Sequence, residues 1–134
     1  VPYLVEVGGR VGGGHTFHPI ASHVSGINYP ELLACLYLGR FDEVRAMLSA
    51  GVRTRGAVYS FPVTDLSGTI RRIGFAQTGA GTLAELWKQP GDVIAGMNSS
   101  MDRLGCVVSL AESREAAMSE SRKTMASFFM DVTS

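Results

Sequence analysis

The sequence predicts an α+β protein, and three observations support this fold class. Short apolar runs bounded by glycine or proline, which are typical of strands, occur near the start of the chain and again after residue 53. Two capped helical patterns follow one another between residues 28 and 51. A glycine-rich segment, residues 8–14, precedes these helices, and five of its seven residues are glycine. The order of strand, glycine loop, two helices, mostly antiparallel sheet and terminal helix fits the α+β class.

The first expected element is a buried strand over residues 3–7, bounded by Pro2 and Gly8. Glu6 lies near its C-terminal end, and the glycine-rich segment follows at once. Such a density of glycine indicates backbone that takes unusual dihedral angles or lies against a ligand. Because the chain opens directly on a strand, without an initiator methionine, we expect it to be a piece of a longer protein.

Two short helices are predicted next, as a compact hairpin. Asn28 and Glu31 have the spacing of a capping box, and apolar residues then recur at helical spacing until Gly39 stops the helix. A second helix is expected from about residue 41 to residue 50, with Gly51 as its cap. The side chains expected to face inward from this second helix are Val44, Met47 and Leu48.

The second half of the chain predicts a small sheet. Strands are expected at residues 57–61 and 69–75, joined by a turn at residues 65–68, and again at residues 92–97 and 104–110. A short helix is expected around residues 83–87. Ser113 is expected to cap a last helix, whose apolar face contains Ala117, Met125, Phe128 and Val132.

Composition excludes several classes of protein. With 134 residues, 46% hydrophobic and 18% charged, the chain is neither disordered nor a coiled coil. Its 12 basic and 12 acidic residues balance, so neither a nucleic-acid partner nor an acidic tail is indicated. No apolar run approaches the roughly 18 residues of a membrane span. Cys35 and Cys106 lie in apolar segments and form no CxxC pair, which predicts reduced core thiols and a cytoplasmic location.

Residues 6–14 carry the most suggestive chemistry. The Glu6 carboxylate is a hard oxygen ligand that suits Mg²⁺, and the Arg10 guanidinium can hold a phosphate or carboxylate through two parallel hydrogen bonds. The glycines at 12–14 would let backbone N–H groups approach an anion. The alternative is a buried Glu6–Arg10 ion pair that closes a glycine-rich turn. Neither a P-loop motif nor a Rossmann fingerprint fits residues 8–14.

The run E-V-G-G-R-V-G-G-G at residues 6–14 resembles the last signature of ATP-grasp carboxylate–amine ligases, written E-x-N-x-R before a glycine-rich turn. Residues 21–28 resemble the passage that leads into the next helix of those enzymes. Residues 68–105, with K-Q-P-G-D at 88–92, are similar in spacing to the small terminal lobe of the amino-acid ligase branch. The resemblance implies that residues 1–52 end an ATP-grasp domain as strand, glycine loop and helical hairpin. Residues 53–134 would form a small α+β lobe packed on it, with a C-terminal helix.

The resemblance also implies an activity and roles for residues. ATP would phosphorylate a substrate carboxylate, for which the resemblance favours that of an amino acid, and an amine would attack the acyl phosphate to give an amide. Glu6 would bind Mg²⁺, and Arg10 would be the catalytic residue that binds the transferred phosphate or the substrate carboxylate. Gly12, Gly13 and Gly14 would shape the acyl and amine site. Gly8 stands where the family has a metal-binding asparagine, so water or another carboxylate would complete the metal shell.

The implied partners are a small carboxylate, an amine and an upstream ATP-binding section of the same enzyme, which is absent from these 134 residues. Ligases of this kind are commonly dimeric, so a homodimer is also expected. A rival interpretation is a non-enzymatic α+β module that binds a small anion or a partner protein. It accounts for the missing ATP-binding half without a further chain.

Two other features bear on binding. His15 directly follows the glycines and is a candidate for the substrate pocket, the alternative being a polar residue at the start of a helix. Arg71 and Arg72 are adjacent on a predicted strand. Because neighbouring strand residues point to opposite faces, we expect them on solvated surface rather than as a pair that binds phosphate.

Overall fold

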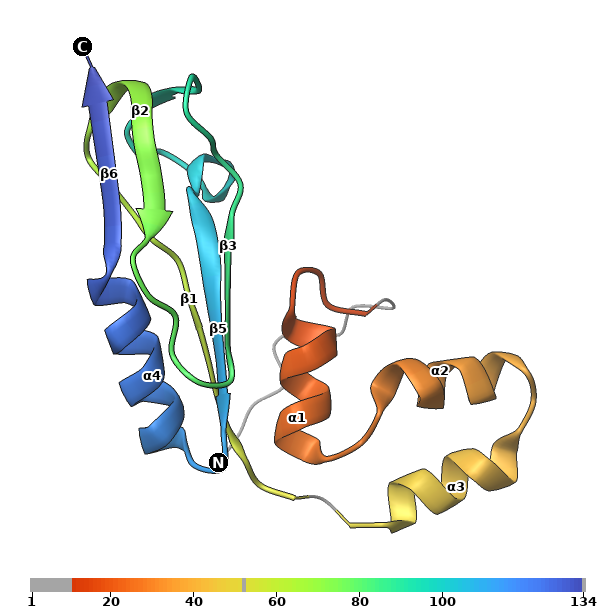
Figure 1. Ribbon diagram of the computed structural model, residues 1–134. Coiled ribbons are helices and arrows are strands. Elements are labelled where there is room, and N and C mark those ends of the chain that lie inside the picture. Colours follow the sequence, from red (N-terminus) through yellow and green to blue (C-terminus); the bar gives the residue numbers. More distant parts are fainter. Residues whose placement is uncertain (1–10, 52, 134) are drawn as a thin grey trace, which may run out of the picture. The chain divides into compact units, whose positions relative to one another are not determined.

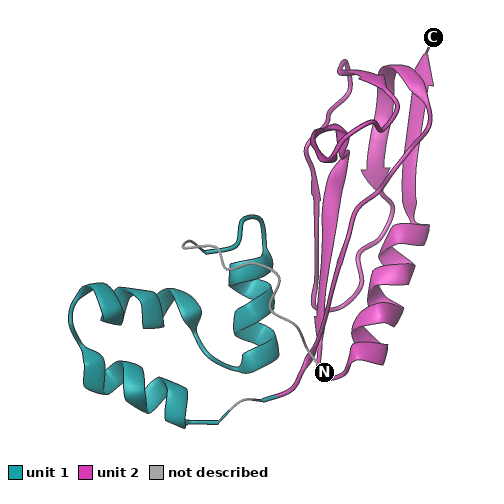
Figure 2. Cartoon of the chain, turned by 180° about the vertical axis from the view of Figure 1, so that it is seen from behind, with its two compact units in different colours: residues 1–53 teal, residues 54–134 magenta. Residues whose placement is uncertain are grey.

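The computed structural model describes residues 11–51 and 53–133. The chain divides into two compact units, residues 1–53 and residues 54–134 (Figure 2). The described part of the first unit is helical, and the second unit contains two antiparallel sheets and a helix. This mixed content confirms the predicted α+β class. The expected first strand, residues 3–7, lies outside the described residues.

The first unit begins with an irregular helical turn, Thr16–Ala21, that continues into the short helix α1 (Ser22–Ser25). The turn is interrupted at His18, whose backbone is extended (φ −145°, ψ 131°). Pro19 follows, and a residue that precedes proline is driven away from the helical region by a clash with the proline ring. The chain leaves α1 at Gly26 in the left-handed conformation, with φ of 75°.

The expected helical hairpin is formed by α2 (Tyr29–Tyr37) and α3 (Phe41–Ser49). The Asn28 side chain accepts a hydrogen bond from the Glu31 N–H at 3.4 Å, so the predicted N-cap is present. Gly39 follows α2 and Gly51 follows α3, and both have the positive φ of a helix stop. One inward assignment was wrong, because Leu48 is 55% exposed.

The second unit contains two three-stranded sheets, β1–β5–β3 and β4–β2–β6, in which every pairing is antiparallel. The strands are β1 (Gly56–Ser60), β2 (Ser67–Phe75), β3 (Thr82–Leu86), β4 (Val93–Ala95), β5 (Gly105–Ala111) and β6 (Phe128–Thr133). Helix α4 (Arg114–Ala126) packs against β1 and β5 (Figure 1). Strands β1 and β2 are consecutive in the chain but lie in different sheets.

The helix predicted around residues 83–87 is wrong, because this segment is strand β3. Leu83 lies opposite Val108 and Glu85 opposite Cys106 in the ladder with β5. The Trp87 N–H donates to the Leu104 carbonyl at 2.9 Å and extends the pairing by one residue. Leucine, alanine and glutamate favour helix, but that preference is weaker than a complete ladder with a buried neighbouring strand.

The predicted terminal helix is also corrected, because α4 ends at Ala126 and strand β6 follows it. Ser127 forms the junction, and the carbonyls of Thr124 (2.8 Å) and Gln77 (2.7 Å) both lie within hydrogen-bond distance of its hydroxyl, which can donate to either. Phe128 and Val132, predicted on the helix face, lie instead on the inward side of β6, where half-buried and exposed residues alternate. The helix is therefore shorter than predicted, and strand β6 follows it.

The prediction that Arg71 and Arg72 point to opposite faces is wrong. Ile70 pairs with Val132 and Arg72 pairs with the next residue back, Asp131, so Arg71 is the extra residue of a β-bulge. Both arginines are exposed, whereas Ile70 is buried and Ile73 packs against the same core. The bulge therefore shifts the alternation of β2 by one residue.

The second unit holds the larger core. Ile70, Ile94 and Leu104 form one cluster, and inward residues of β6 pack against it. The centre of β5 is fully enclosed, since Cys106 and Val107 are 0% exposed. Cys35 and Cys106 are buried free thiols, as predicted. No helix in the described part of the chain is long and apolar enough to cross a membrane.

Candidate functional site

The two residues with the strongest predicted roles, Glu6 and Arg10, lie outside the described residues, and so does Gly8. The structure does describe the remaining predicted site residues, Gly12–His15. These four residues form the turn that leads into the first helical segment. We call them the glycine turn.

Local hydrogen bonds fix the glycine turn at its helical end. The Thr16 hydroxyl donates to the Gly13 carbonyl, and the Ile20 N–H donates to the His15 carbonyl at 3.0 Å. The side chain of His15 is half-buried, whereas the three glycines are exposed. The turn therefore presents bare backbone at its glycines and one imidazole next to them.

Gly13 and Gly14 differ in what they tolerate. A Cβ at Gly13 would meet no heavy atom within 4 Å, so the space beside this residue is open. Gly14 has φ of 63°, in the left-handed region that side chains with a Cβ rarely adopt. A Cβ at Gly12 would lie 3.1 Å from the Thr16 hydroxyl oxygen, a tight contact. Backbone geometry thus explains glycine at 14, while nothing among the described residues requires it at 13.

The other two histidines, His18 and His23, lie after the glycine turn in the helical part of the first unit. His18 lies 3.3 Å from the Ser22 hydroxyl through Nδ1, and His23 lies within α1. Within the described ranges, the three histidines do not come together as a group that could hold a metal ion. Of the three, His15 alone belongs to the glycine turn.

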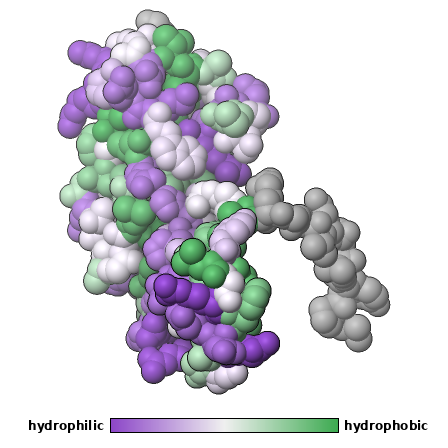
Figure 3. All heavy atoms as spheres, turned by 90° about the vertical axis from the view of Figure 1, so that its right-hand side faces the viewer, coloured by the Kyte–Doolittle hydropathy of each residue, from purple (hydrophilic) through white to green (hydrophobic). Residues whose placement is uncertain are grey.

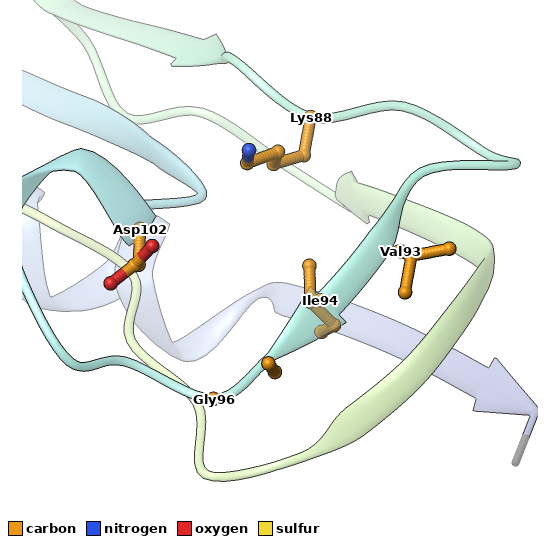
Figure 4. A pocket seen from close by; sticks show the side chains of 6 residues that line it. Lys88, Val93, Ile94, Gly96 and Asp102 are labelled. Carbon is orange, nitrogen blue, oxygen red and sulfur yellow. The ribbon is translucent and has the colours of Figure 1, made fainter.

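A second feature, which the sequence did not single out as a site, is a hollow of about 160 Å³ beside β4. Figure 4 shows the Lys88 side chain extending across this hollow toward Asp102. Its floor is formed by β4 and the residue after it; the lining comprises Lys88, Val93, Ile94, Ala95, Gly96 and Asp102.

The Asp102 carboxylate in this hollow is hydrogen-bonded to the backbone of its own loop. It accepts hydrogen bonds from the N–H groups of Asn98 at 3.0 Å and Ser99 at 2.7 Å. These bonds, together with the nearby Lys88 ammonium, hold the pKa of Asp102 below its ordinary value. Ser99 in turn accepts from the Met101 N–H, which completes a capping box. The Ser99–Asp102 spacing was a sequence signal for this box. Lys88 is the group left to attract an anion here.

The K-Q-P-G-D segment at 88–92 is a tight turn between β3 and β4. The Gln89 N–H donates to an Asp92 carboxylate oxygen at 2.9 Å, and the Asp92 N–H donates back to the Gln89 carbonyl at 3.1 Å. Gly91 has φ of 98°, and its N–H donates to the Ile70 carbonyl at 2.8 Å. This segment therefore positions Lys88 at the edge of the hollow.

Comparison with solved structures shows what the chain resembles. The crystal structure of phosphoribosylglycinamide synthetase from Anaerococcus prevotii is similar, with a TM-score of 0.69 and 14% sequence identity. The match covers 84% of this chain and 29% of that chain. That protein is an ATP-grasp enzyme, so the resemblance predicted from the sequence is confirmed at the level of the fold. No family model and no curated protein sequence matches the chain.

Proposed function

We propose that the chain is the C-terminal portion of an ATP- and Mg²⁺-dependent ligase that joins a carboxylate, of an amino acid by preference, to an amine. The observation that carries this proposal is the likeness of fold to an ATP-grasp enzyme over 84% of the chain. The E-V-G-G-R-V-G-G-G run at residues 6–14 supports it independently, because the run resembles the family's last signature. The chain spans 29% of the length of the structure it matches, so the complete enzyme would need a further ATP-binding section.

The donor set of the predicted site suits part of a magnesium site. Glu6 would supply one hard carboxylate oxygen, while Gly8 has no side chain to supply the second ligand that the family's asparagine gives. When bound, Mg²⁺ neutralises charge on the phosphates during phosphoryl transfer. Arg10 would bind the transferred phosphate or the substrate carboxylate by paired hydrogen bonds.

The glycine turn would contribute backbone rather than side chains. The open space beside Gly13 would let the substrate approach the main chain closely. His15 next to it would hydrogen-bond the substrate through its imidazole. The two free buried thiols suit the cytoplasmic location proposed for this enzyme.

The test uses the complete ligase, meaning this chain together with the ATP-binding section, in one polypeptide or two. Glu6→Gln should lower amine-dependent ADP formation by at least about a hundredfold, because the variant loses a metal oxygen with little change of shape. Circular dichroism should show that the variant stays folded.

Glu115→Gln is the matched control, since Glu115 is exposed on α4 in the second unit. It should leave turnover unchanged. Full activity in Glu6→Gln would end the assignment of Glu6 to the metal. If denaturing mass analysis of the purified preparation finds this 14.3 kDa chain alone and that preparation shows no ATP turnover, the anion- or protein-binding module becomes the better interpretation.

A further inference from the structure

The β-bulge in β2 brings two guanidinium groups to one face of the β4–β2–β6 sheet. In a regular strand, Arg71 and Arg72 would lie on opposite faces. The shift of register between Ile70 and Arg72 makes both arginines exposed. Both line a hollow of about 400 Å³, together with Asp131 and Val132 of β6. Figure 1 shows β2 and β6, the two strands that supply these residues, side by side.

The charges of this hollow are not balanced. Arg72 Nη1 lies 3.6 Å from an Asp131 carboxylate oxygen, and both side chains are mostly exposed, at 71% and 57%. Such a pair is weak, because water competes for both groups. Among the described residues, no carboxylate forms an ion pair with Arg71. One guanidinium is thus unpaired and the other is loosely held, so the hollow carries a net positive charge.

An aromatic ring steadies one of the two arginines. The Arg72 guanidinium carbon lies 5.4 Å from the centre of the Phe129 ring, which is within the range of a cation–π contact. Phe129 lies directly opposite Gly74 in the ladder, and its ring covers the space where Gly74 lacks a side chain. The ring therefore supports Arg72 through this contact, which lowers the entropy that Arg72 would lose on binding a ligand.

From this geometry we propose that the hollow formed by Arg71, Arg72 and Asp131 binds the phosphate group of a small phosphorylated molecule. Two planar guanidiniums match the oxygens of a phosphate dianion by paired hydrogen bonds, and guanidinium is favoured over ammonium for this geometry. A carboxylate offers two oxygens and one negative charge, whereas a phosphate dianion offers three terminal oxygens and two charges to the two guanidiniums. The site lies on β2 and β6 and uses none of residues 6–15, so it goes beyond the proposed ligase site.

The test is an NMR titration of the arginine Nε–H resonances of the chain with inorganic phosphate, at ionic strength held constant with chloride. We expect saturable shifts at Arg71 and Arg72. Arg71→Gln or Arg72→Gln should weaken binding about tenfold, the loss of one charged hydrogen-bonding group. Asp131→Asn should strengthen binding several-fold, because it removes a repelling carboxylate and releases Arg72.

Arg122→Gln serves as the control, because Arg122 is exposed on α4 and carries the same charge away from the hollow. It should leave the affinity unchanged. A second titration with glycerol phosphate separates the two sources of the group. Tighter binding than that of inorganic phosphate indicates a phosphorylated metabolite, and equal binding indicates the free ion.

Absence of saturation at millimolar phosphate would overturn the proposal. So would equal weakening by Arg122→Gln, which indicates non-specific charge attraction, or weaker binding in Asp131→Asn. Because all four side chains are exposed, the spectra of the remaining residues should confirm that each variant keeps its fold.

Discussion

Two adjacent residues of the glycine turn, Gly13 and Gly14, are held by different physical constraints. Gly14 adopts φ of 63°, which an alanine would adopt only with a clash between its Cβ and the backbone. Gly13 does not have a positive φ, and a Cβ there would meet no heavy atom within 4 Å. Backbone conformation therefore constrains residue 14, whereas residue 13 would be constrained only by the substrate proposed above.

This difference predicts opposite outcomes for two alanine substitutions. Gly14→Ala should lower the free energy of unfolding by about 1–2 kcal/mol, measured by denaturant titration. Gly13→Ala should leave it unchanged or raise it by up to about 1 kcal/mol, because alanine restricts the unfolded chain. In the complete ligase, Gly13→Ala should raise the substrate KM at least about tenfold, since one methyl group would fill the approach to the backbone. An unchanged KM would contradict the role of residue 13.

At single residues, the sequence predicted local hydrogen bonds better than it predicted the face of a strand on which a side chain lies. The capping pair Asn28 and Glu31 was predicted from spacing and is present, because a cap depends on residues close in the chain. The shared face of Arg71 and Arg72 could not be predicted, because a bulge depends on the register between β2 and the distant β6. The roles of Glu6 and Arg10 stay predictions.

Among the elements, the β2–β6 pair contains a contact that tests its register. A Cβ at Gly74 would lie 2.6 Å from Cζ of Phe129, the residue directly opposite it. The aromatic ring therefore occupies the place of the missing side chain, an arrangement that compensates for glycine in a strand. Phe129 is 38% exposed, so its ring has room to move if it is displaced.

A double-mutant cycle checks this contact. Gly74→Ala alone should lower the free energy of unfolding by about 1 kcal/mol, because the methyl group displaces the ring. In a Phe129→Ala background, the same change should raise it by about 0.5–1 kcal/mol, since alanine is better than glycine in a strand interior. Denaturant titration of the four proteins gives both values. Equal effects in the two backgrounds would show that Phe129 does not cover Gly74.

The elements that the sequence placed wrongly are those whose structure depends on partners. A helix was expected around residues 83–87, and Phe128 and Val132 were expected on the face of the last helix. Both segments instead belong to strands, β3 and β6, that are paired along their length. Their apolar residues fit a helical face as well as a strand, because short apolar runs do not distinguish the two periods. Strands β1, β2, β4 and β5 were predicted, because β-branched residues and bounding turns marked them.

At the scale of the whole molecule, the two units differ in how many apolar side chains each one buries. In the second unit, β5 lies between β1 and β3, and residues 104–109 are all buried. In the first unit, the buried apolar side chains are Ile27, Cys35 and Val44 within the described range. Exposed apolar residues lie along the α2–α3 hairpin: Leu36, Tyr37, Leu38, Phe41 and Leu48. Figure 3 likewise shows hydrophobic residues at the surface among hydrophilic ones.

Native-state hydrogen exchange should show this difference as two levels of protection. Strand β5 is paired on both sides, so its amides should exchange only on global unfolding of the second unit. Amides of α2 and α3 should exchange at least about a hundredfold faster in the isolated chain, because few buried contacts oppose local opening. A matched measurement on residues 54–134 alone should leave the β5 rates unchanged, since the two partner strands of β5, β1 and β3, lie within that unit. Equal protection of α3 and β5 would show instead that one cooperative transition unites the two units, and that the small core of the hairpin is sufficient for its stability.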